Sequence, residues 1–222
     1  MDIALLGGTG DIGEGLALRF AYHTNHDVLV GSRRAAKAEG KAEEYETELD
    51  SRGIDVTIEG GTNEDVATVA DVVVLAVPPY HVTDIIEAVA DELDEGDILV
   101  SPATGMDRDD HGFHYAPPPA GSVTEHAAAA VPDGVPLVGA FHNLAAARLA
   151  NLDAELGIDT FVLADDEDAK DIVKHLAEGI GGLRVLDAGP IANAAEVESL
   201  TPLLINVATN NEGLHDLGLE LK

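Results

Sequence analysis

Residues 1–37 of the chain read MDIALLGGTGDIGEGLALRFAYHTNHDVLVGSRRAAK. The short apolar run at residues 1–6 predicts a buried strand, and residues 7–13 (GGTGDIG) hold glycines at the spacing Gly-x-Gly-x-x-Gly. Apolar side chains then recur at helical spacing from Ile12 to Phe20. A strand, a glycine turn and a helix in this order predict the start of a dinucleotide-binding fold, in which the helix N-terminus offers free N–H groups to a pyrophosphate.

The three glycines of this turn have separate tasks in such a fold. Gly8, Gly10 and Gly13 would serve the tight turn, the approach of the backbone to pyrophosphate and the close packing of helix on strand. The spacing alone is a weak signal, because a chain with 23 glycines in 222 residues produces chance matches. The flanking strand and helix make it specific.

The end of the second apolar run, residues 27–30, indicates which dinucleotide binds. A site for NAD places Asp or Glu about 20 residues after the glycines, where it binds the ribose 2′-hydroxyl. Here Arg33 lies 20 positions after Gly13, with Ser32 beside it and no acid before Glu39. Guanidinium groups hold a phosphate with two hydrogen bonds, whereas a carboxylate repels it. The sequence therefore predicts NADP.

The scarcity of cations supports this interpretation. Arg33, Arg34 and Lys37 are three of only 12 Lys and Arg residues in a chain of formal net charge −30. An arginine pair at a helix start is usually a solvent-exposed feature. Because cations are so few and gather at the predicted phosphate position, the cluster favours cofactor selection instead.

The composition of the chain indicates a globular protein and disfavours several other classes. A hydrophobic content of 45% predicts a globular fold with a sizeable core, as one large domain or a domain with a small partner. Eight Phe and Tyr, no Trp and the acidic balance disfavour nucleic-acid binding. The absence of cysteine excludes disulfides and thiolate sites. Without a signal peptide or an apolar run of about 18 residues, the expected location is the cytoplasm, with no membrane partner.

Strand and helix signals alternate along the first 141 residues. The strands are continuous apolar runs, which indicates burial on both faces, as in a parallel sheet covered by helices. The chain therefore predicts an α/β, Rossmann-type, doubly wound fold. Expected strands are 3–6, 28–30, 55–58, 71–77, 98–101 and 137–141, and expected helices are 12–22, 35–52, 63–70, 80–93 and 122–130.

The alternation loosens in the second part of the chain. Residues 1–141 are predicted to form the NADP-binding Rossmann domain, and residues 142–222 a small C-terminal α/β extension that forms the second wall of a cleft. A loop rich in Gly, Asp, His and Pro is expected at 102–121. The extension is expected to contain helices at 143–150 and 165–178, strands at 160–164 and 183–186, and a long last helix at 192–211, disturbed by Pro202.

Few residues suggest proton or metal chemistry. The nine histidines form no H-x-x-H or HExxH pair, so no metal site is expected, and no G-x-S-x-G motif suggests a hydrolase. His142 follows a predicted strand at its carboxyl end, where this fold places ligands, although a histidine satisfied within the core is an equal alternative. Hydride exchange between two cofactors needs stacking, distance and orientation rather than an acid–base group.

Several longer segments resemble one family over nearly all 222 residues. The chain is similar to the NADP-dependent reductases of coenzyme F420, the 8-hydroxy-5-deazaflavin:NADP oxidoreductases of archaea and some bacteria. The resemblance implies reversible hydride transfer between C4 of the nicotinamide and C5 of the deazaflavin, and a homodimer. The matching segments are 4–10, 15–19, 30–34, 37–39, 63–65, 100–102, 151–153, 186–190 and 197–203.

The resemblance also implies roles for individual residues, with no catalytic acid or base among them. The residues are Thr9, Gly10, Asp11 and Ile12 at the pyrophosphate; Ser32, Arg33 and Lys37 at the 2′-phosphate; Pro79, Thr83 and Ala146 at the nicotinamide; His142 and Leu144 at the hydride-transfer pocket; and Ser199, Thr201 and Leu217 at the deazaflavin.

Two departures from the family pattern affect the deazaflavin half. Relatives often have Ser-Arg after the residue that matches Asn193, where this chain has Ala194-Ala195. A cation near the acidic tail of the coenzyme is thereby lost. The His-x-x-Pro pattern of relatives is His142-Asn-Leu-Ala145 here. Two other functions stay open: NADP-dependent reduction of another acceptor, such as ferric iron or a small imine, and a non-enzymatic NADP-sensing module.

The acidic residues are spread along the whole chain and form no tail. Forty-two Asp and Glu residues would repel one another at low ionic strength, whereas molar salt shortens the Debye length to about 3 Å and screens the repulsion. We interpret the composition as halophilic adaptation, typical of a halophilic archaeon with a high-salt cytoplasm.

This interpretation predicts loss of structure on dialysis into low salt. The measurement is the thermal unfolding midpoint in potassium chloride between roughly 0.2 and 3 M. We expect the midpoint to rise with salt, and a midpoint independent of salt would contradict halophilic adaptation.

Overall fold

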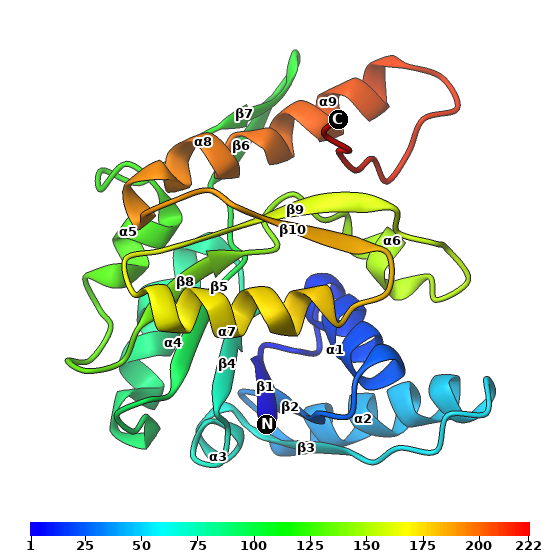
Figure 1. The fold of residues 1–222 in the computed structure, drawn as a ribbon, viewed down its shortest axis with the longest axis vertical. Helices are drawn as coiled ribbons and strands as arrows, with labels where there is room; N and C mark the ends of the chain where they lie inside the picture. The colour runs from blue at the N-terminus through cyan, green and yellow to red at the C-terminus, as the bar shows by residue number, and fades with distance from the viewer.

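The computed structural model describes residues 1–222, built around one eight-stranded sheet in the order β10-β9-β8-β5-β4-β1-β2-β3 (Figure 1). Neighbouring strands are parallel, except that β9 runs antiparallel to β8. The strands are β1 (Asp2–Leu6), β2 (Asp27–Ser32), β3 (Ile58–Thr62), β4 (Val72–Leu75), β5 (Ile98–Ser101), β8 (Leu137–Ala140), β9 (Ile158–Ala164) and β10 (Leu183–Asp187).

Helices cover both faces of this sheet. Side chains alternate along β1, so Ile3 and Leu5 join a cluster of 35 buried residues with α1, α2 and α7, while Ala4 and Leu6 join a cluster of 18 with α3, α4 and α5. The doubly wound fold predicted from the apolar strands is confirmed. The helices are α1 (Asp11–His23), α2 (Ala35–Asp50), α3 (Asn63–Ala67), α4 (Val82–Val89), α5 (Val123–Ala128), α6 (Ala146–Ala150), α7 (Glu167–Glu178), α8 (Ala194–Glu198) and α9 (Leu200–Asn210), with short 3₁₀ turns η1 (Pro79–His81), η2 (Ala90–Glu92) and η3 (Ile191–Asn193).

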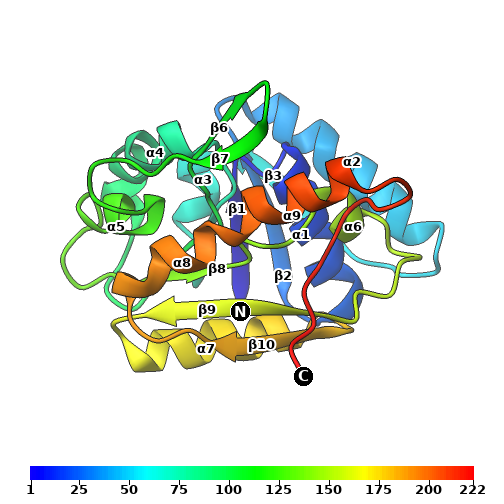
Figure 2. The ribbon, with the colours of Figure 1, turned by 90° about the horizontal axis from the view of Figure 1, so that it is seen from above.

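The C-terminal part extends the same sheet. α6 packs against α1 instead of crossing the sheet, so β9 starts beside the carboxyl end of β8 and runs back along it. β10 then pairs with β9 in parallel. Figures 1 and 2 show α8 and α9 running across the end of the molecule opposite the N-terminus.

Two expected elements were wrong in the first part of the chain. β3 spans 58–62 rather than 55–58, because Gly60 and Gly61 belong to the strand. A Cβ at Gly60 would lie 2.5 Å from Cα of Glu39, so the glycine lets α2 approach the strand closely. The expected loop at 102–121 contains a hairpin of β6 (Met106–Asp109) and β7 (Gly112–Tyr115), whose mostly solvent-accessible side chains give no apolar strand signal.

The last helix is interrupted at a different residue from the one expected. α8 ends at Glu198 and α9 begins at Leu200, so the break falls at Ser199. Pro202 lies in the first turn of α9, where the missing N–H of proline has no helical partner to lose. The proline is therefore compatible with the helix start.

The end of β8 carries an unusual backbone conformation. Phe141 has φ +67°, a region that bulky residues rarely adopt. Its ring packs edge-on against Phe20 of α1 at a centroid distance of 6.1 Å, and its side chain is 1% exposed. The sharp change of direction at Phe141 sends residues 142–145 across the carboxyl end of the sheet.

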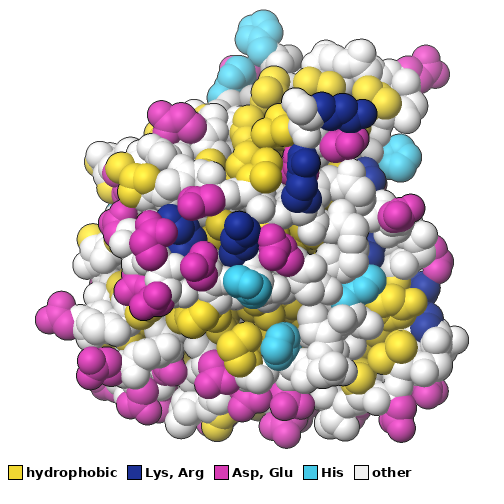
Figure 3. Space-filling model, viewed as in Figure 1, with side chains coloured by type: hydrophobic (Ala, Val, Ile, Leu, Met, Phe, Trp, Pro, Cys, Tyr) yellow, Lys and Arg dark blue, Asp and Glu magenta, His cyan; other side chains and the backbone are white.

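None of the helices is both long and apolar enough to cross a lipid bilayer. Acidic side chains are spread over the face shown in Figure 3, with no single acidic patch.

The contact between α1 and α6 depends on Gly15. A Cβ at this position would lie 2.5 Å from Cβ of Leu149, so we expect Gly15→Ala to lower the free energy of unfolding by about 1–3 kcal/mol, as overpacking does. Gly40→Ala is the matched control in α2, because nothing lies within 4 Å of its Cβ. The control should gain about 0.5–1 kcal/mol. Urea unfolding of both variants measures this, and equal effects would contradict the tight contact.

Candidate functional site

A cavity of about 550 Å³ opens at the carboxyl ends of β1, β2 and β4. The glycine turn and the start of α2 line one side, and the segment from β4 into α4 lines the other. The lining residues are Gly7, Thr9, Gly10, Ser32, Arg33, Lys37, Asn63, Glu64, Ala76, Val77, Pro78, His81, Asp84, Ile85 and Ala88.

The glycines of the turn meet different physical constraints. A Cβ at Gly8 would lie 2.7 Å from the carbonyl oxygen of Leu5, and one at Gly13 would lie 2.5 Å from Cα of Gly8. Both positions therefore exclude any side chain. Gly10 has only the Gly7 oxygen nearby, at 3.5 Å, so its open side faces space that a ligand could fill.

The helix start behind this turn can receive an anion. Gly10 is the N-cap of α1 and supplies no side chain, so the first N–H groups of the helix have no partner within it. Asp11, Ile12 and Gly13 form this first turn. Aligned N–H groups and the helix dipole favour negative charge there.

Two of the three clustered cations face the cavity. Arg33 and Lys37 line it, and Nζ of Lys37 donates to Oγ1 of Thr9 at 2.7 Å, which joins α2 to the glycine turn. Arg34 is exposed and outside the lining, at the N-cap of α2. Ser32 is buried at the end of β2 and lines the cavity.

A second cavity of about 500 Å³ lies between the start of α6, the inner side of α9 and the C-terminal tail. Eight of its 13 lining residues are hydrophobic, which suits a flat aromatic ring system. The structure brings together Ala146, predicted at the nicotinamide, Leu144, predicted at the hydride-transfer pocket, and Thr201 and Leu217, predicted at the deazaflavin. The lining residues are Asn143, Leu144, Ala145, Ala146, Thr201, Leu204, Ile205, Ala208, Thr209, Leu214, His215, Asp216 and Leu217.

Three residues predicted for the nicotinamide and deazaflavin sides lie outside both cavities. Ser199, at the break between α8 and α9, donates its hydroxyl to the carbonyl of Glu196 at 2.7 Å. Pro79 begins η1, and Thr83 lies in the first turn of α4. Neither lines either cavity.

His142, expected at the hydride-transfer pocket, has its side chain turned into the interior. His142 is 3% exposed, and its Nε2 lies 3.3 Å from Oγ1 of Thr124 in the interior. Only its backbone serves the second cavity, because its carbonyl accepts from Oγ1 of Thr201 at 2.7 Å. Burial lowers the pKa of His142 to about 4, so the imidazole is neutral at physiological pH.

Sequence reasoning missed a buried carboxylate behind this histidine. Glu198 has no exposed surface and accepts from the N–H groups of Val123 and Thr124, from Oγ1 of Thr124 and from Oη of Tyr115, at 3.0–3.1 Å. Burial raises the pKa of Glu198, and these four donors oppose that rise. The carboxylate joins β7, α5 and α8. Glu198 is one of 42 acidic residues, and no local sequence pattern marks it as a buried residue that joins three elements.

Comparison with known proteins relates the chain to one family. The family model described as NADP oxidoreductase, coenzyme F420-dependent, matches residues 2–105, which include the first cavity. The F420-dependent NADP reductase of Methanocaldococcus jannaschii is 38% identical over 209 residues, covering 93% of this chain and 92% of that protein. The chain belongs to the F420-dependent NADP reductase family.

Further relatives agree with this membership. The F420-dependent NADP reductase of Methanothermobacter thermautotrophicus is 37% identical and covers 95% of this chain and 90% of its own length. A crystal structure from Arthrobacter sp. FB24, assigned as an F420-dependent NADP reductase, superposes with a TM-score of 0.81 at 24% identity, over 100% of this chain and 99% of that one. At this identity the structural likeness concerns the fold alone.

The family departure at Ala194-Ala195 forms the start of α8, and Ala195, which matches the missing arginine, is partly exposed. Ala194 is fully buried in a small cluster with Leu163 and Val197. No group of three His, Asp or Glu side chains is placed to hold a metal ion.

The buried histidine gives a testable pH dependence. An unfolded histidine takes up a proton below about pH 6.5, whereas His142 in the fold resists protonation down to about pH 4. The neutral His142 imidazole therefore contributes fully to the free energy of unfolding above pH 6.5. This free energy falls by up to about 3 kcal/mol as the pH drops to 4.

Urea unfolding of wild type and His142→Gln between pH 7 and 4 measures this contribution. The difference between their free energies of unfolding should shrink toward acid pH. His111→Gln, at the exposed turn of the hairpin, is the control. Parallel curves for wild type and His142→Gln would contradict the buried neutral histidine.

Proposed function

We propose that this protein transfers a hydride reversibly between NADP(H) and the deazaflavin coenzyme F420. The observation that carries the proposal is the pair of cavities joined through α1 and α6. Gly10 at the start of α1 lines the first, and Ala146 at the start of α6 lines the second. The relatives from Methanocaldococcus jannaschii and Methanothermobacter thermautotrophicus, which match 93% and 95% of the chain, are named F420-dependent NADP reductases.

The first cavity fits NADP. The open side of Gly10 and the N–H groups of the first turn of α1 would receive the pyrophosphate. Arg33, Lys37 and Ser32 would hold the 2′-phosphate. Lys37, already 2.7 Å from the Thr9 hydroxyl, is within reach of both phosphate positions.

The second cavity fits the deazaflavin, with the nicotinamide at its edge near Ala146. Leu144 and Leu217 supply apolar surface from opposite sides, and Thr201 supplies a hydroxyl fixed by the His142 carbonyl. In the proposed reaction the C4–H bond of the nicotinamide breaks and a C–H bond forms at C5 of the deazaflavin. The protein binds the rings, orients them and excludes water.

The titratable side chains of the second cavity agree with this chemistry. His215 and Asp216 lie at its rim, where Nδ1 of His215 is 3.0 Å from Oδ2 of Asp216. The His215 side chain is 85% exposed, so nothing fixes it toward a bound ring. Reduction of an imine would need a held proton donor. The cavity therefore favours hydride exchange.

We further propose that the protein works as a homodimer in a high-salt cytoplasm. Support for self-association comes from α9, which has no charged residue although the net charge of the chain is −30. Leu203 and Val207 on its outer side are 54% and 37% exposed, and apolar side chains gather over this end of the molecule (Figure 3). Support for the high-salt setting comes from the spread of acidic residues.

Mixing the protein with NADPH and F420 in molar salt tests the function directly. We expect the long-wavelength absorbance of the deazaflavin to bleach as NADPH is consumed. Bound NADPH with unchanged absorbance would reject the proposal. Turnover of ferric iron or an imine alone would favour another acceptor, and binding without any turnover a sensing module.

In the same assay, Arg33→Ala should weaken NADPH binding more than tenfold and NADH binding little, because a charged hydrogen bond contributes about 1.5–3 kcal/mol. Arg34→Ala is the matched control, since this neighbour lies outside the cavity lining. Titration of both cofactors gives the dissociation constants. Equal losses for NADPH and NADH in Arg33→Ala would show that Arg33 does not bind the 2′-phosphate.

A further inference from the structure

Arg19 is a buried arginine without a carboxylate partner. It lies on α1, is 2% exposed, and remains charged at physiological pH. The cost of burying a charge is high unless hydrogen bonds satisfy it. The Arg19 guanidinium is satisfied by hydrogen bonds to backbone carbonyls from a segment about 130 residues away in the chain.

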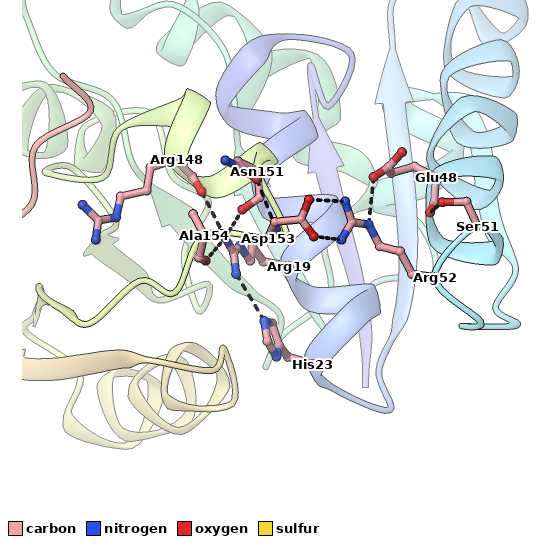
Figure 4. A network of polar contacts seen from close by, with 9 residues as sticks. All are labelled: Arg19, His23, Glu48, Ser51, Arg52, Arg148, Asn151, Asp153 and Ala154. Atoms are coloured by element: carbon pink, nitrogen blue, oxygen red, sulfur yellow. Dashed lines mark hydrogen bonds and ion pairs between the residues drawn. The ribbon is translucent and has the colours of Figure 1, made fainter.

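Four carbonyls converge on this guanidinium, and Figure 4 shows three of them, those of Arg148, Asn151 and Ala154. Nε donates to Leu149 at 2.8 Å, while one terminal nitrogen donates to Arg148 at 3.0 Å, Asn151 at 2.7 Å and Ala154 at 3.0 Å. These residues form the end of α6 and the turn after it. A five-residue helix leaves most of its carbonyls without a helical partner, so Arg19 satisfies the end of α6 and also fixes its position.

A second arginine reaches the same turn from the surface. Arg52, after α2, binds Asp153 through two nitrogens, at 2.5 and 3.3 Å, and Glu48 at 2.9 Å (Figure 4). The Asp153 side chain is 79% exposed, so salt screens this pair. The bonds of Arg19 are buried or partly buried and use uncharged acceptors. Arg19 therefore provides the stronger constraint in molar salt.

The contact between α1 and α6 links the two cavities. α1 starts at the glycine turn of the first cavity, and α6 starts at Ala146 in the second. Between them, a Cβ at Gly15 would lie 3.2 Å from the carbonyl oxygen of Ala146. Arg148, whose carbonyl Arg19 holds, donates through its own side chain to the carbonyls of Leu156 and Asp216, and Asp216 belongs to the tail that closes the second cavity.

We propose that Arg19 is a positioning residue for hydride transfer, because it fixes the wall of the second cavity relative to the NADP-binding helix and thereby sets the separation of the two rings. This inference rests on the proposed function. Hydride transfer depends steeply on distance, and a displacement of about 1 Å can slow an enzyme about a hundredfold. The contacts that bind NADPH lie at the other end of α1 and do not involve Arg19.

Arg19→Lys keeps a positive charge but cannot span four carbonyls. We expect its kcat for F420 reduction to fall between about ten- and a hundredfold, with KM for NADPH within about twofold of wild type. With NADPH deuterated at C4 on the transferred side, the isotope effect on kcat should increase, because hydride transfer becomes slower relative to product release. All rates are divided by the folded fraction, measured by circular dichroism under the assay conditions.

Arg52→Gln is the matched control, since it releases the same turn from its exposed side only. Its kcat should stay within about twofold of wild type. Amide hydrogen exchange over residues 146–154 provides a readout independent of activity, and should accelerate in Arg19→Lys more than in Arg52→Gln.

The outcomes separate the two proposals. A wild-type protein that binds NADPH without reducing F420 refutes the proposed function. An active wild type with a normal kcat and isotope effect per folded molecule of Arg19→Lys, despite faster exchange, refutes the positioning role and leaves Arg19 as a purely structural group.

Discussion

Arg19 places a guanidinium in the interior of the protein, where it donates to four backbone carbonyls at the end of α6 and in the turn that follows. The arrangement of both cavities depends on this contact, because α1 begins at one and α6 begins at the other. Gly15 allows the close approach of the two helices, and the carbonyl acceptors keep the contact independent of the acidic surface. The chain has only 12 Lys and Arg residues, and one of them is buried at this contact.

A second polar network attaches α8 and α9 to the sheet. The apolar cluster under α8 contains three buried residues, which is little surface to hold two helices. Glu198 adds four hydrogen bonds to neighbouring elements, and Thr124 continues the network to His142. The His142 carbonyl then fixes Thr201 at the second cavity. Both oxygens of the Glu198 carboxylate accept hydrogen bonds, whereas the buried Nδ1 of His142 has no partner.

Local patterns predicted the central strands well, since β1, β2, β4, β5 and β8 are continuous apolar runs. They failed where the strand signal is not apolar. Gly60 and Gly61 look like a turn but lie in β3, and at Gly60 α2 comes too close for a side chain. The hairpin of β6 and β7 has mostly exposed side chains, and Pro202 is accommodated by a helix start that no local pattern indicated. In each case a distant contact decided the conformation.

The sequence by itself determined the doubly wound fold and the preference for NADP, because a strand, a glycine turn, a helix and the basic residues from Arg33 to Lys37 are close together in the chain. The family resemblance added the deazaflavin. Only the tertiary structure decided which residues form the second cavity, since it joins residues 143–146, 201–209 and 214–217. It also turned His142 inward and gave Arg19 and Glu198 their partners. Those outcomes depend on contacts between distant segments, which short-range periodicity does not encode.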